Sequence, residues 1–110
     1  MNAVADPGPA VFAALADPTR WRMLGMLAER GEGTATTLAA GLPVSRPAVI
    51  KHLTVLDAAG LVTRRRAGRE VRYRVEPARL GATARRMADL AAAWDARLGA
   101  LKAMAETEET

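Results

Sequence analysis

The stretch SRPAVIKHLTVLDAAGLV, residues 45–62, decides how the rest of the chain is arranged. Within it Val49, Leu53 and Leu56 recur at the spacing of one helical face, which predicts a buried stripe. The opposite face combines donors with methyl groups, which suit base edges and phosphates in a major groove. This face consists of Arg46, Ile50, Lys51 and Thr54. Because ordinary solvated helix surfaces look similar, the flanking sequence must decide between the two interpretations.

The two ends of this helix are marked by local signals. Ser45 can cap the N-terminus, and Pro47 is tolerated in the first turn because no intrahelical bond needs its N–H. Gly60 can end the helix, so that Leu61 folds back against the apolar stripe. The sequence therefore predicts a short helix over about residues 45–60.

Composition limits the class of protein. The chain has 110 residues, half of them hydrophobic, which predicts a single domain with a modest core. It has no cysteine, which excludes disulfides, thiolate metal sites and thiol nucleophiles. Its longest apolar run, residues 10–16, is too short to span a membrane, and no signal peptide precedes it. We therefore expect a cytoplasmic protein.

Positive charge is concentrated in one segment. The chain carries a net charge of +4, but residues 64–74 alone hold six arginines and one glutamate, so the remainder is close to neutral. A basic segment on a near-neutral body is typical of a surface that binds a polyanion, with nucleic acid first and an anionic membrane second.

Three helices are predicted before residue 45. The first covers residues 10–16, and Asp17 and Pro18 then start a second that runs to about Arg30. Its expected buried stripe is Trp21, Leu24, Leu27 and Ala28, and its expected outward residues are Arg20, Arg22 and Glu29. Thr34 can cap a brief third helix, and a turn over residues 41–44 leads to Ser45. This is helix-turn-helix spacing, although structural helical hairpins share it.

Beyond Gly60 the pattern changes to that of strands. Residues 61–66 are extended, residues 67–69 make a turn, and residues 70–75 alternate apolar with charged, which predicts a β-hairpin. We expect one face to pack on the helices and the other to present arginine. The alternative is an edge hairpin that uses charge only to prevent aggregation.

A long helix is predicted over residues 77–107. It carries an unbroken heptad seam, more apolar surface than the small body can cover, so a second copy of the chain is the expected cover. The seam consists of Leu80, Ala84, Met87, Ala91, Trp94, Leu98, Leu101 and Ala105. We expect residues 1–8 to be mobile and residues 108–110 to fray, leaving one domain over residues 9–107.

Three segments together carry a resemblance to a known family. ALADPTRWRMLGML, LPVSRPAVIKHLTVLDAAGLV and RRRAGREVRYRV resemble, in order and spacing, the ArsR-type winged helix-turn-helix regulators of prokaryotes, over about residues 11–101. The resemblance implies a mainly α fold with a small β-hairpin wing over residues 61–75 and a C-terminal dimerisation helix. It also implies a homodimeric repressor that binds a palindromic operator in double-stranded DNA.

The candidate residues follow from the patterns and the resemblance together. The resemblance places Arg46, Pro47, Ile50 and Lys51 in the major groove, and wing residues Arg65, Arg66 and Arg69 on the backbone or in the minor groove. The candidate DNA-binding residues are Ser45, Arg46, Pro47, Ile50, Lys51, His52, Thr54, Arg64, Arg65, Arg66, Arg69 and Arg72. The candidate dimer-interface residues are Phe12, Met87, Leu90, Ala91, Trp94, Leu98 and Leu101.

No catalytic, metal or cofactor site is expected. The single histidine, His52, has no nucleophile or carboxylate at a motif spacing, and we interpret it as a partly buried, hydrogen-bonded residue rather than a metal ligand. Many members of the family sense soft metals through cysteine clusters, which this chain lacks, so an effector cannot be named. The alternative function is a winged-helix module whose basic wing binds an acidic protein.

Overall fold

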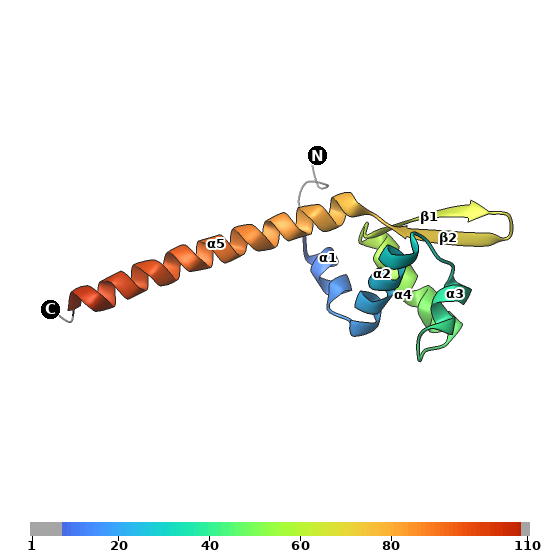
Figure 1. Ribbon diagram of the computed structural model, residues 1–110, viewed down its shortest axis with the longest axis horizontal. Coiled ribbons are helices and arrows are strands. Elements are labelled where there is room, and N and C mark those ends of the chain that lie inside the picture. Colours follow the sequence, from blue (N-terminus) through green and yellow to red (C-terminus); the bar gives the residue numbers. More distant parts are fainter. Residues whose placement is uncertain (1–7, 109–110) are drawn as a thin grey trace.

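The computed structural model describes residues 8–108. In chain order it contains α1 (Gly8–Leu15), α2 (Pro18–Arg30), α3 (Ala35–Ala40), α4 (Arg46–Ala58), β1 (Val62–Ala67), β2 (Glu70–Val75) and α5 (Pro77–Glu108). The four short helices and the hairpin form a body from which α5 projects (Figure 1). This confirms the predicted fold, mainly helical with a two-stranded antiparallel hairpin and a long C-terminal helix. Residues 1–7, most of the segment expected to be mobile, lie outside the described residues.

The core of the body lies between α1, α2, α3, α4 and the start of β1. Val49, Leu53 and Leu56 of α4 are fully buried, as the stripe predicted. Burial of each such side chain contributes about 1.5–3 kcal/mol. The other buried hydrophobic residues are Val11, Ala14, Met23, Leu24, Leu27, Ala35, Leu38, Ala59, Leu61 and Val62.

The buried stripe of α2 differs from the prediction. Met23 is fully buried, while Trp21 is 59% exposed and Ala28 is also exposed. Leu24 and Leu27 lie in the core both in the prediction and in the structure. The observed orientation of α2 therefore differs from the predicted one by a rotation of a fraction of a turn about its axis. Spacing alone could not separate the two rotations, since both place apolar residues on one helical face.

Both ends of α4 are closed by the predicted residues. The Ser45 side chain accepts a hydrogen bond from the backbone N–H of Ala48 at 3.3 Å. At the other end, Leu61 N–H donates to the carbonyl of Leu56 and Gly60 N–H donates to that of Asp57, the two bonds of a Schellman motif. Gly60 has a φ of +77°, a conformation that L side chains rarely adopt. This turn directs the chain from α4 straight into β1.

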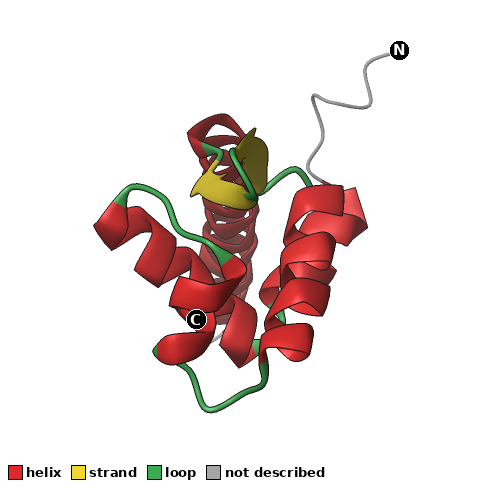
Figure 2. Cartoon of the chain, turned by 90° about the vertical axis from the view of Figure 1, so that its right-hand side faces the viewer, coloured by secondary structure: helices red, strands yellow, loops and turns green. Residues whose placement is uncertain are grey.

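The hairpin has a simple register and one additional pairing. Val62 lies opposite Val75, Arg64 opposite Tyr73 and Arg65 opposite Arg72. Backbone hydrogen bonds in both directions also join Tyr73 to Gly33, at 2.8 and 3.0 Å, so the α2–α3 loop extends the sheet edge. Seen from the hairpin end, the strands lie beside the short helices and α5 recedes behind them (Figure 2).

The sequence predicted arginine on only one face of the hairpin, but the structure places arginine on both faces. Residues that face each other across an antiparallel ladder point to the same side, so Arg64 shares a face with Tyr73, while Arg65 and Arg72 share the other. Tyr73 and Val75 pack against the core. The three consecutive arginines at 64–66 necessarily alternate between the faces.

The helix α5 contacts the body only through its first turns. Leu80 packs against the core and Thr83 is buried, but every residue from 84 to 107 is exposed. The radius of gyration, 19.2 Å, therefore exceeds the roughly 13 Å of a compact domain of this length. The helix includes Glu108, within the tail expected to fray, and residues 109–110 lie outside the described part. Over the described residues no helix is long and apolar enough to cross a membrane.

Candidate nucleic-acid interface

The face of α4 that points away from the core carries the predicted donors and methyl groups. Arg46, Pro47, Ile50, Lys51 and Thr54 are all exposed. Their exposure follows from the burial of the opposite stripe, because α4 packs on the core with Val49, Leu53 and Leu56 facing inward. The face is therefore open to solvent and to a binding partner.

Two threonines support this face. The hydroxyl of Thr54 donates to the carbonyl of Ile50 at 3.0 Å, which leaves its oxygen available as an acceptor. Arg46 Nε donates to Oγ1 of Thr36 on α3 at 3.1 Å. The sequence analysis did not identify Thr36, and no local pattern links a residue on α3 to one on α4. Its contact orients the Arg46 side chain across the turn between the two helices.

His52 holds α4 to the junction of α1 and α2. Its Nδ1 lies 3.2 Å from Nη1 of Arg20. Because arginine only donates, Nδ1 accepts this hydrogen bond, which in the neutral ring leaves the hydrogen on Nε2. Arg20 also donates through Nε to the carbonyl of Ala14 at 2.6 Å and through Nη2 to that of Ala13 at 3.2 Å. Arg20, expected to point outward, is thus folded over the C-terminus of α1, where two carbonyls of the last turn accept its hydrogen bonds.

Asp17 begins α2 beside this contact. Its carboxylate accepts hydrogen bonds from the backbone N–H groups of Thr19 and Arg20, at 2.8 and 3.2 Å. Partial burial opposes ionisation, but these two N–H groups, with the positive charge of Arg20, outweigh it and lower the pKa of Asp17. The carboxylate therefore remains charged at the helix N-terminus, where it is stabilised by the helix dipole.

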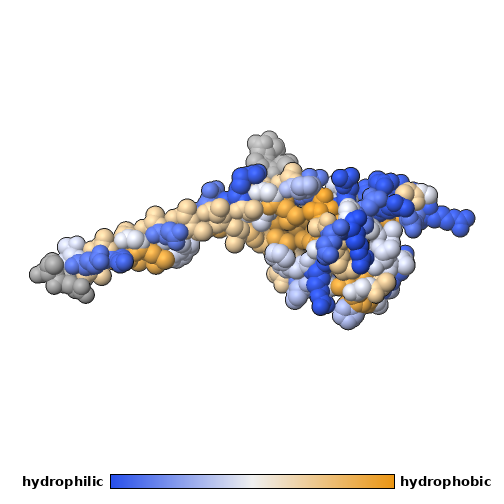
Figure 3. All heavy atoms as spheres, in the orientation of Figure 1, coloured by the Kyte–Doolittle hydropathy of each residue, from blue (hydrophilic) through white to orange (hydrophobic). Residues whose placement is uncertain are grey.

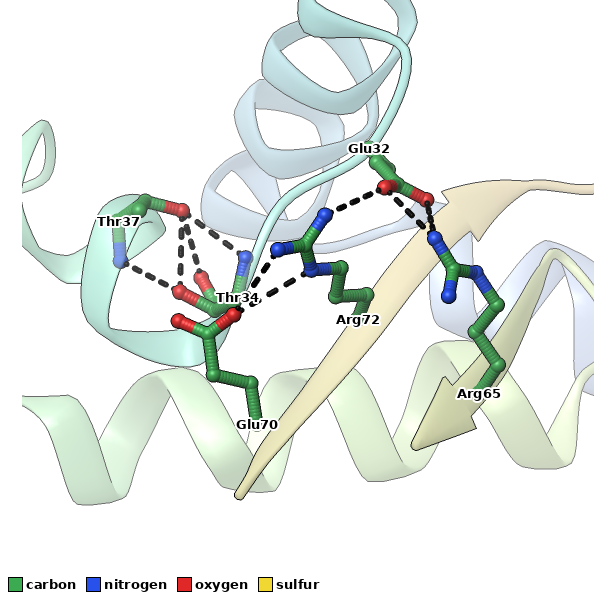
Figure 4. A network of polar contacts seen from close by, with 6 residues as sticks. All are labelled: Glu32, Thr34, Thr37, Arg65, Glu70 and Arg72. Carbon is green, nitrogen blue, oxygen red and sulfur yellow. Dashed lines mark hydrogen bonds and ion pairs between the residues drawn. The ribbon is translucent and has the colours of Figure 1, made fainter. Parts of the chain in front are cut away.

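Arg65 and Arg72 of the wing are held by carboxylates (Figure 4). Arg65 Nη2 lies 3.0 and 3.3 Å from the two carboxylate oxygens of Glu32, and Arg72 Nη1 lies 3.1 Å from one of them. Glu70 contacts the other side of Arg72 at 3.2–3.3 Å. The hydrogen bond from Arg72, with the charge of Arg65, lowers the pKa of Glu32, and the two glutamates raise that of Arg72. The sequence did not point to Glu32, which lies 33 and 40 residues from its partners.

The remaining arginines of the wing differ in whether a carboxylate lies close to them. Arg64 lies 3.6 Å from the carboxylate of Asp57, with the arginine side chain 62% exposed and that of Asp57 38% exposed. Arg66, Arg69 and Arg74 are exposed and have no carboxylate partner among residues 8–108. Half of the six arginines in this segment are therefore open to an external anion.

The predicted dimer-interface residues form a continuous exposed apolar surface. An open groove of about 550 Å³ lies where α1 and α2 meet the start of α5, and apolar residues gather there in the surface view (Figure 3). The groove is lined by Phe12, Leu15, Trp21, Leu24, Gly25, Ala28, Leu80, Thr83, Ala84 and Met87. Along α5 the surface continues through Leu90, Trp94, Leu98 and Leu101, all exposed. The guanidinium of Arg97 lies 5.1 Å from the ring centre of Trp94, a cation–π contact on this surface.

No group of three or more histidine, aspartate or glutamate side chains comes together to hold a metal ion among the residues that the structure describes. His52, the only histidine of the chain, is engaged with Arg20 instead. The chemistry of the site is thus that of hydrogen-bond donors and positive charge.

Comparisons with known proteins bear directly on this surface. A family model described as a helix-turn-helix domain matches residues 15–65, from the end of α1 into β1. An ArsR-like transcriptional regulator from Rhodococcus is 50% identical, with a TM-score of 0.81 and 89% of each chain covered. This chain belongs to the ArsR family of winged helix-turn-helix transcriptional regulators. The recognised family thus agrees with the resemblance found in the sequence.

Two curated relatives extend the comparison. The HTH-type transcriptional regulator YuzN of Bacillus subtilis, itself uncharacterised, is 44% identical over 72 residues, which cover 60% of this chain and 75% of that protein. The arsenic resistance transcriptional regulator ArsR1 of Pseudomonas putida is 42% identical over 69 residues, 63% of this chain. That match spans only 54% of the Pseudomonas protein.

Proposed function

We propose that this chain is a sequence-specific DNA-binding transcriptional regulator that acts as a homodimer, most simply as a repressor. The observation that carries the proposal is the exposed donor-and-methyl face of α4 next to a wing with unpaired arginines. Membership of the ArsR family supports it. Its place of action would be the cytoplasm, on the nucleoid.

In this proposal α4 reads bases and the wing binds the backbone. Arg46 and Lys51 would donate to base edges or phosphates, Ile50 would contact a thymine methyl, and Pro47 would lie close to the DNA at the helix start. Ser45 supports the helix end as its cap. His52 acts through its contact with Arg20, which fixes α4 on the body. Arg66 and Arg69 are the wing residues best placed to meet phosphate, since the carboxylates of the described residues leave them free.

The dimer would form through α5. A second copy is the proposed cover because the exposed seam runs for several turns and is continuous with the groove beside Phe12 and Trp21. A two-fold dimer presents the same surface from each chain, so each α5 could fill the other copy's groove. Such a dimer could place its two α4 helices about one DNA turn, roughly 34 Å, apart and read an inverted repeat.

Selection of genomic DNA fragments by the purified protein tests the function, beginning with DNA upstream of its own gene. A regulator should enrich one sequence and bind it at least about 10³-fold more tightly than random duplex at the same salt concentration. Equal affinity for all duplexes, with tighter binding to an acidic protein, would contradict the proposal and favour the alternative function of an acidic-partner module.

A further inference from the structure

The pair formed by Arg65 and Arg72 resembles an occupied anion site. The two residues lie directly opposite each other on β1 and β2, so their side chains leave the same face of the hairpin. Like charges in that position repel each other unless an anion lies between them. Glu32 supplies this anion, with one carboxylate within 3.0–3.3 Å of both guanidinium groups. A planar carboxylate and a phosphate make similar hydrogen bonds with arginine.

The backbone holds Glu32 in place for this contact. Gly31, with a φ of +85°, ends α2 by donating its N–H to the carbonyl of Leu27. Gly33 forms two backbone hydrogen bonds with Tyr73 of β2. Glu32 is thus fixed on both sides, and its side chain, 29% exposed, is less exposed than those of Arg65 (55%) and Arg72 (41%).

We propose that Glu32 occupies a phosphate-binding site made by Arg65 and Arg72 and thereby limits sequence-independent binding to DNA. This inference rests on the proposed function. Glu32 is a positioning residue, because it acts on DNA binding through the two arginines and not by contact with DNA. With Glu32 in place, the wing offers mainly Arg66, Arg69 and Arg74 to phosphates. Sequence discrimination then depends more heavily on α4.

The inference predicts a gain of binding when the carboxylate is removed. Glu32→Gln keeps the shape of the side chain and removes its charge. Arg65 then has no carboxylate partner and should take phosphate instead, while Arg72, which Glu70 still contacts, should do so only on the side that Glu32 held. Binding to a labelled, mixed-sequence DNA duplex should tighten by about three- to tenfold at moderate salt, and the slope of log K against log salt should steepen by about one unit for each arginine that reaches a phosphate.

A matched control separates this effect from a general change of charge. Glu29 is exposed on the last turns of α2, three residues from Glu32, and has no ion pair with the wing among the described residues. Glu29→Gln makes the same change of net charge and should leave the salt slope unchanged. A triple variant, Glu32→Gln with Arg65→Ala and Arg72→Ala, should lose the gain, because the arginines that produce it are absent.

The experiment measures all four proteins, wild type included, on the same duplex over a range of salt, with thermal unfolding to show that each is folded. A Glu32→Gln slope equal to that of Glu29→Gln, or a gain that persists in the triple variant, would overturn the role of Glu32 while leaving the proposed function intact. A wild type that binds no duplex at any salt would overturn the proposed function and this role with it.

Discussion

The body and the free part of α5 use apolar residues in opposite ways. In the body Leu53 is fully buried by the chain itself, whereas Leu98 on α5 is 57% exposed although both are leucines on helices. The difference arises from the surroundings, because the short helices fold back on one another and α5 runs away from them (Figure 1). The body is stabilised within one chain, while α5 needs a second surface to bury its seam.

This contrast indicates that the body and the free part of α5 have different roles. The body holds α4 and the wing in a defined relation, through the core, the Gly60 turn and the Arg20–His52 contact. The free part of α5 carries no predicted DNA contact, and in the proposed dimer it sets how the two bodies are placed. Variants in the two regions should therefore fail in different assays.

The largest expected effect is the loss of a core leucine. Leu53→Ala should lower the free energy of unfolding by about 2–5 kcal/mol, because it leaves a cavity under α4. Leu98→Ala is the matched substitution on α5, and its effect should depend on protein concentration, because it acts on the dimer. Denaturant titrations at two protein concentrations measure both. If Leu98→Ala lowered the free energy of unfolding as much as Leu53→Ala does, and equally at both protein concentrations, the distinction between a body buried within one chain and an α5 buried by a second copy would be contradicted.

The next largest effect concerns the dimer and DNA affinity together. Trp94→Glu with Leu98→Glu places charges on the seam and should yield a helical monomer by sedimentation. Because two linked half-sites bind as one event, losing the link should weaken operator binding by about 10²-fold or more. Trp21→Glu at the groove should act in the same direction. A monomer that keeps full operator affinity would show that the seam has no part in DNA binding.

Discrimination between sequences should change by a smaller amount and without a change of oligomeric state. Lys51→Ala removes a donor from the exposed face of α4 and should cost about 1–3 kcal/mol of discrimination between the operator and a mutated operator if a base contact is lost. Lys102→Ala removes the same charge from α5 and serves as the control. Competition binding with the two duplexes provides the measurement. If Lys51→Ala and Lys102→Ala changed the discrimination between the duplexes equally, α4 would not be the element that recognises the DNA sequence.

The smallest expected effect separates two neighbouring arginines of the wing. Arg66→Ala should flatten the salt slope of non-specific binding by about one unit, since Arg66 is free to bind a phosphate. Arg65→Ala should change it less, because Glu32 already holds Arg65. Titrations on one mixed-sequence duplex compare them. If Arg65→Ala had the larger effect, the ion pair with Glu32 would not persist on DNA.

Local patterns in the sequence predicted most of the fold. The stripe at Val49, Leu53 and Leu56, the Ser45 cap and the Gly60 stop each depend on residues within one turn or helix, and the structure shows all three. The α2 stripe was predicted less well, because Trp21 is apolar and correctly spaced yet lies in the open groove. Periodicity reports which residues share a face, and not how much of that face another element covers.

The candidate site was predictable where exposure alone defines it and not where contacts cross the chain. The exposed face of α4 follows from the burial of its opposite side. The partners Thr36, Glu32 and Arg20 could not be found in this way, since each meets its target only after α2, α3, α4 and the hairpin have packed. The alternation of Arg64 and Arg65 between hairpin faces was implicit in the period of a strand, but the partner of each face was not.

The most direct test of the account compares a duplex that carries both half-sites of a selected operator with one that carries a single half-site. The account predicts that two chains bind the full operator together, at least about 10²-fold more tightly than the single half-site, and that this difference disappears in the Trp94→Glu, Leu98→Glu variant. Equal affinity of the wild type for the two duplexes, with one chain bound to each, would contradict a dimer that reads DNA through paired α4 helices.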